Sequence, residues 1–207
     1  MVDKNGGLVY TPAEATNAGI DYIKSIAANK HRAMPVYIAG IRDYFAPVMP
    51  GRIAAVIAQT SHYKSGFLRF QARETAREIA STPERAGECL FWISTEEDIE
   101  EQMLHEFAHY GDEPIHNLAH GTVLDWDRLL GHATEISSVP IYRIGVSMSD
   151  VRGVESTDLY MSNIARELVW AVDEFNLKVA GLFVDYLQAY EMIERSGGRY
   201  MKVMIDL

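Results

Sequence analysis

The sequence has a single cysteine and lacks long apolar runs. Cys89 has no second cysteine to pair with, which excludes an internal disulfide and favours a reducing, cytoplasmic setting. No apolar run approaches the roughly 18 residues that a membrane span needs. Residues 1–7 lack the apolar segment of a signal peptide. We therefore expect a cytoplasmic protein without a membrane partner.

Acidic residues outnumber basic residues, and the two kinds are unevenly distributed along the chain. The 207 residues include 19 Lys and Arg against 29 Asp and Glu, a formal net charge of −10. Residues 1–86 hold 11 basic and 7 acidic side chains, whereas residues 87–207 hold 8 and 22. Such a chain is not typical of a protein that coats DNA through its overall charge. A basic face on the first part can still meet phosphates.

Short apolar runs alternate with helical patterns along the chain. Four apolar runs predict strands buried on both faces: 53–58, 89–93, 139–144 and 179–184. Apolar spacing and capping residues predict helices around them: 11–30, 65–81, 98–110, a helix starting at 125, and 156–175. This alternation indicates an α/β fold, a mostly parallel sheet flanked by helices on both faces. We expect a helical N-terminal extension over 1–33 and one core domain over 34–207.

Polar residues that suit nucleotide chemistry follow three of the predicted strands. Ala58-x-x-x-x-Tyr63-Lys64-Ser65 is a phosphate-loop pattern with both glycines replaced, in which the lysine meets phosphates and the hydroxyl meets magnesium. Glu96 follows the second strand, where a carboxylate can activate water, and Asp185 ends the fourth, where it can hold magnesium. Ligands bind at the carboxyl ends of parallel strands, so the three positions fit one site.

The order and wording of these segments resemble the RecA-type, P-loop NTPase core of DnaB-like replicative helicases, from about Met34 to the end. Four segments carry the resemblance: Pro50-Gly51-Arg52 with Ala58–Ser65, Phe91–Glu96, Val139–Tyr142, and Val184-Asp185-Tyr186-Leu187-Gln188. The last matches the family's Asp-Tyr-Leu-Gln signature and is the most specific. The family continues beyond this signature to an arginine finger, so the resemblance implies a core shortened at its C-terminus.

The resemblance implies an ATPase that acts with Mg²⁺ on single-stranded DNA in replication or recombination, as a ring-forming, hexameric homo-oligomer. The nucleotide would be held by the loop residues Ala58, Gln59, Thr60, Ser61, His62, Tyr63, Lys64 and Ser65. Ser65 and Asp185 would hold magnesium, and Glu96, rather than the adjacent Glu97, would polarise the attacking water. Gln188 would support the site.

Tyr63 stands where this family has glycine, and it favours a second hypothesis. Glycine allows close approach of the backbone to phosphate and unusual dihedral angles, whereas a tyrosine Cβ crowds the loop. Together with the missing arginine finger, this substitution is typical of a degenerate, non-hydrolysing module that binds DNA or partner subunits.

Two further patterns allow other interpretations. His105-Glu106-Phe107-Ala108-His109 matches H-E-x-x-H, in which two histidines on one helix face bind zinc and the glutamate acts as base, so a zinc metallohydrolase is the third hypothesis. An ordinary helix is the favoured interpretation. Arg69, Arg73 and Arg77 recur every four residues, as a phosphate- or subunit-contacting stripe or, preferably, as a solvated face paired with Glu74 and Glu78.

Overall fold

The computed structural model describes residues 10–57, 63–94, 97–123, 125–145 and 161–185. The chain divides into two compact units, Met1–Ile57 and Ala58–Leu207. The expected division between an extension and a core at residue 33 stays a prediction. No helix of the described residues is both long and apolar enough to cross a bilayer.

The first unit contains the predicted N-terminal helix, α1 (Pro12–Ala28). Its capping box is formed: the Thr11 N–H donates to Glu14 Oε2 at 2.8 Å, and the Glu14 N–H donates to Thr11 Oγ1 at 3.3 Å. Two short 3₁₀ turns follow, η1 (Lys30–Arg32) and η2 (Arg42–Tyr44). The helix and its start are therefore confirmed.

The strand predicted over 53–58 is wrong for the residues that the structure describes. Residues 53–57 form no regular element and are exposed; Ile57 is 92% accessible. Ala58 lies outside the described residues. A strand needs a neighbour that takes up its backbone N–H and C=O groups, and apolar composition alone does not supply one.

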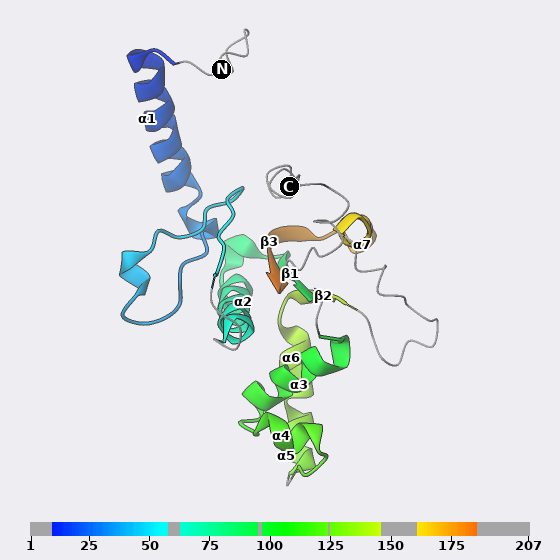
Figure 1. The fold of residues 1–207 in the computed structure, drawn as a ribbon. Coiled ribbons are helices and arrows are strands. Elements are labelled where there is room, and N and C mark those ends of the chain that lie inside the picture. The colour runs from blue at the N-terminus through cyan, green and yellow to red at the C-terminus, as the bar shows by residue number, and fades with distance from the viewer. Residues whose placement is uncertain (1–9, 58–62, 95–96, 124, 146–160, 186–207) are drawn as a thin grey trace, which may run out of the picture. The chain divides into compact units, whose positions relative to one another are not determined.

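The second unit alternates helices and strands (Figure 1). Its elements in chain order are α2 (Lys64–Ser81), η3 (Pro83–Arg85), β1 (Glu88–Ser94), α3 (Ile99–Tyr110), α4 (Ile115–Ala119), α5 (Trp126–Gly131), α6 (Ala133–Ser138), β2 (Ile141–Ile144), α7 (Met161–Glu174) and β3 (Lys178–Asp185). The other three predicted strands and the helices near 65–81, 98–110 and 125 are confirmed. The helix predicted over 156–175 is confirmed over Met161–Glu174, and residues 156–160 lie outside the described residues. The short helices α4 and α6 were not predicted.

Within the described residues the strands form a three-stranded sheet in the order β2-β1-β3, and both pairings are parallel. Leu90 pairs with Ile141 on one side and with Gly181 on the other. The predicted α/β class with a parallel sheet is confirmed. Because the strands are parallel, their carboxyl ends meet at one edge.

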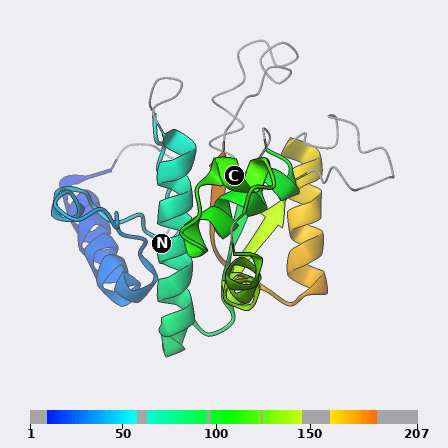
Figure 2. The ribbon, with the colours of Figure 1, turned by 90° about the horizontal axis from the view of Figure 1, so that it is seen from below.

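Alternating residues of β1 pack against helices on opposite faces of the sheet. Leu90 is fully buried against Ala76 and Ile79 of α2. Cys89 and Phe91 point the other way and pack against Ala171 of α7. Figure 2 shows α2 and α7 on opposite sides of the strands. This arrangement explains why β1 reads as a continuous apolar run.

Candidate functional site

The carboxyl edge of the sheet brings two buried polar residues together. Ser94 ends β1 and Asp185 ends β3, and the two are register partners. Both are almost fully buried, at 1% and 4% exposure. A buried carboxylate is unusual because charged side chains are rarely buried. This one lies at the edge where parallel sheets bind ligands, which makes it a candidate site residue.

The first turn of α2 lies at the same edge because α2 runs antiparallel to β1. Near its start, the Arg69 guanidinium lies 5.7 Å from the centre of the Trp92 ring, late in β1. Further along, Ala76 and Ile79 pack on Leu90, in the middle of the strand. Lys64 and Ser65, the first residues of α2, therefore lie toward the end of the sheet that carries Asp185.

Tyr63 adopts the backbone conformation for which glycine is favoured. Its φ and ψ are 54° and 29°, in the left-handed region. Its carbonyl accepts the first helical hydrogen bond, from the Phe67 N–H at 2.8 Å, and its side chain is 86% exposed. A Cβ at this position therefore carries a conformational cost.

The structure describes four of the predicted site residues and places them on two elements. Tyr63, Lys64 and Ser65 form the entrance to α2, and Asp185 ends β3. The other predicted residues lie outside the described residues: Ala58, Gln59, Thr60, Ser61, His62, Glu96 and Gln188.

The arginine stripe of α2 is mostly buried, which corrects its interpretation as a solvated face. Arg69 and Arg73 are 7% and 9% exposed, and Arg69 pairs with Glu97 beyond β1. Only Arg77 follows the expected pattern, pairing with Glu74 at 2.5 Å on the exposed side. The first two arginines face inward because the half-buried carboxylate of Glu97 and the buried carboxylate of Glu106 compensate their charge.

The Glu97 carboxylate is paired with Arg69 and His105. Arg69 donates to its carboxylate, and His105 Nε2 lies 3.5 Å from the other oxygen. Burial raises the pKa of Glu97, but the hydrogen bonds from His105 and Arg69 and the charge of Arg69 outweigh it, and the pKa falls to about 2. Glu97 is thus ionised at neutral pH and holds Arg69 and His105 through its carboxylate.

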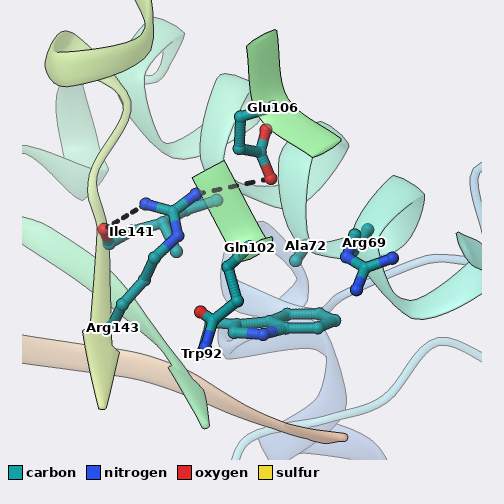
Figure 3. A pocket seen from close by; sticks show the side chains of 7 residues that line it. All are labelled: Arg69, Ala72, Trp92, Gln102, Glu106, Ile141 and Arg143. Atoms are coloured by element: carbon teal, nitrogen blue, oxygen red, sulfur yellow. Dashed lines mark hydrogen bonds and ion pairs between the residues drawn. The ribbon is translucent and has the colours of Figure 1, made fainter. Parts of the chain in front are cut away.

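Glu106 is buried and lines the cavity of Figure 3, which draws its contact with Arg143; its second partner, Arg73, is not drawn there. Its two carboxylate oxygens lie 3.4 Å from Arg73 Nη1 and 3.3 Å from Arg143 Nη2. Arg143 also donates to the Ile141 carbonyl at 3.4 Å. These contacts tie α3 to both α2 and β2, and they give Glu106 a structural role.

The histidines of the H-E-x-x-H pattern have separate surroundings. His105 pairs with Glu97, whereas the His109 ring contacts Tyr110 edge-on at 5.4 Å. Partial desolvation and the charges of Arg73 and Arg77 lower the pKa of His109. Among the described residues, no group of three or more His, Cys, Asp and Glu is placed to hold a metal ion.

Sequence reasoning missed Ser94 as a neighbour of Asp185, and Glu97 as the partner of Arg69. The alternation of β1 gives a signal for Ser94, because it shares the face of Leu90 and Trp92 that α2 covers. No local spacing signals the pairing of Arg69 with Glu97, since they lie 28 residues apart.

No family model, curated protein or solved structure matches the chain.

Proposed function

We propose that the chain is a nucleotide-binding ATPase core of the RecA type, related to DnaB-like replicative helicases. The observation that carries the proposal is the shared edge: Lys64 and Ser65 begin α2 at the end of the sheet where Asp185 is buried beside Ser94. A helix entrance with a lysine and a hydroxyl, opposite a carboxylate that ends a parallel strand, suits a triphosphate with its metal.

The residues present fit Mg²⁺ as a cofactor. The hydroxyl of Ser65 and the carboxylate of Asp185 are hard oxygen donors, and magnesium is usually held by one or two protein groups together with phosphates and water. The chemistry that Mg²⁺ supplies when bound is neutralisation of phosphate charge. Lys64 contacts phosphate oxygens, and Glu96 orients the attacking water. Single-stranded DNA and further copies of the chain are the partners that this function entails.

A non-hydrolysing nucleotide or DNA module is the second candidate, favoured by Tyr63. Its left-handed φ of 54° places a side chain where phosphate loops keep glycine. Turnover separates the two candidates. ATP hydrolysis stimulated by single-stranded DNA and lost in Glu96→Gln supports the ATPase, whereas nucleotide binding without turnover supports the module.

Calorimetry with ATP and Mg²⁺ tests the proposed site directly. We expect micromolar binding in the wild type and a loss of at least about tenfold in Lys64→Ala. Lys178→Ala is the matched control, because Lys178 is exposed at the opposite, amino-terminal end of β3. Absence of binding at millimolar nucleotide in the wild type would refute the proposal, as would equal losses in the two variants.

A further inference from the structure

A partly buried ion pair joins α2 to Glu97, which follows β1 in the sequence. Arg69 lies in the second turn of α2, is 7% exposed and donates to the carboxylate of Glu97. Its guanidinium also covers the Trp92 ring. Taking the charge of Arg69 out of water is costly unless an opposite charge lies close to it, so this contact constrains both elements.

Glu97 is itself fixed through its backbone. Its N–H donates to Ser94 Oγ at 3.1 Å, and its carbonyl accepts from Gln102 Nε2 at 3.0 Å. The carboxylate has a second partner in His105. Glu97 therefore links the end of β1 to α3 and gives Arg69 a partner that is held by contacts to Ser94, Gln102 and His105.

The consequence for the candidate site follows from the helix period. Ser65 lies four residues before Arg69, so the two share the sheet-facing side of α2, one turn apart. Through Glu97, Arg69 is tied to Ser94, whose register partner is Asp185. The ion pair is thereby one of the contacts, beside the packing of Ala76 and Ile79 on the sheet, that connect the start of α2 to the strand end of Asp185.

We propose that Arg69 is a positioning residue that holds Ser65 and Asp185 at the spacing one Mg²⁺ requires. This inference rests on the proposed nucleotide-binding function. Magnesium demands near-ideal geometry at 2.0–2.1 Å from its ligands, so small displacements of α2 weaken metal-dependent binding more than contacts to the nucleotide alone. Arg69 itself contacts neither the metal nor the phosphates.

The test compares binding of a non-hydrolysable ATP analogue in Mg²⁺ and in EDTA. In Arg69→Gln we expect the Mg²⁺-dependent gain in affinity to fall about tenfold or more, with affinity in EDTA unchanged within about twofold. Arg69→Lys restores part of the gain because it keeps the charge. Arg77→Gln is the matched control: it lies on the same stripe, two turns on, and its pair with Glu74 is more exposed.

Hydrogen exchange of the ligand-free proteins tests, without nucleotide, whether the Arg69–Glu97 ion pair holds the start of α2 in place. Arg69→Gln is expected to speed exchange in residues 64–70 but not in 75–81. The double variant Arg69→Gln/Glu97→Gln removes both charges of this pair, which controls for unfolding caused by one charge left behind. It is expected to show the same loss of the Mg²⁺-dependent gain.

Three results would overturn the inference: unchanged exchange at 64–70, an unchanged Mg²⁺-dependent gain, or equal losses in Mg²⁺ and EDTA. Wild-type protein that binds no nucleotide would instead refute the proposed function, and this inference with it, before any variant is compared.

Discussion

The buried carboxylate of Glu106 offers a quantitative test of what holds the second unit together. It is 6% exposed and lies 3.4 Å and 3.3 Å from nitrogens of Arg73 and Arg143. Removing one partner from a buried ion pair costs about 3–5 kcal/mol because the remaining charge stays desolvated. Both contacts are long, and Arg143 keeps some contact with solvent, so we expect about 3 kcal/mol for Glu106→Ala.

Urea unfolding followed by tryptophan fluorescence measures this loss. Glu101→Ala is the control on the same helix, with an exposed side chain and an expected cost below about 1 kcal/mol. Glu106→Gln keeps the shape but turns an amide donor toward a guanidinium, so about 2 kcal/mol is expected. A cost for Glu106→Ala no larger than that of the control would refute the inference that these charges are desolvated. It would leave Glu106 available for the zinc-hydrolase role.

Three further predictions follow from Tyr63, Glu97 and His105. In urea, the free energy of unfolding of Tyr63→Gly is expected to be about 1 kcal/mol larger than that of Tyr63→Ala. Both variants lose the ring, but only alanine keeps a Cβ at positive φ. Equal free energies of unfolding would contradict the left-handed conformation. The pKa of Glu97 lies near 2 rather than 4.5, so its ionised form stabilises the fold above about pH 4.5, and this contribution disappears as the pH falls toward 2. The difference in Tm between wild type and Glu97→Gln should therefore shrink between pH 4.5 and 2. A constant difference in Tm would count against the pairing. Protein prepared without added metal is expected to carry no stoichiometric zinc by mass spectrometry, since His105 and Glu106 are engaged in ion pairs; one zinc per chain that is lost in His105→Ala would restore the zinc-hydrolase hypothesis.

Local sequence patterns were sufficient to predict most helices and strands of the second unit. The apolar run around Leu90 and the capping residue Asp98 predict β1 and the start of α3, and both are present. These signals succeed because a strand buried on both faces has few polar residues, and because an N-cap side chain bonds its own helix.

The run at 53–58 shows where such patterns fail. Its apolar content equals that of a buried strand, but whether a strand forms depends on a partner elsewhere in the chain. Residues 53–57 are exposed and irregular, so composition was a poor guide there.

The ionic contacts of the site were beyond sequence reasoning for a similar reason. The i+4 spacing of Arg69 and Arg73 identified a common face, but a solvated and a buried stripe have the same spacing. The partners, Glu97 and Glu106, come from a segment that only the tertiary fold brings close. Asp185, by contrast, was predictable because it ends an apolar strand.

Because Cys89 is buried beneath α7, its chemical modification can report when α7 separates from the sheet. The thiol is 2% exposed beneath α7, and burial, together with the negative charge of Glu88, raises its pKa to about 11. At neutral pH the folded protein therefore presents almost no thiolate to an alkylating reagent. Modification requires α7 to separate from the sheet. The labelling rate of this single cysteine therefore measures how often α7 separates, and no engineered probe is needed.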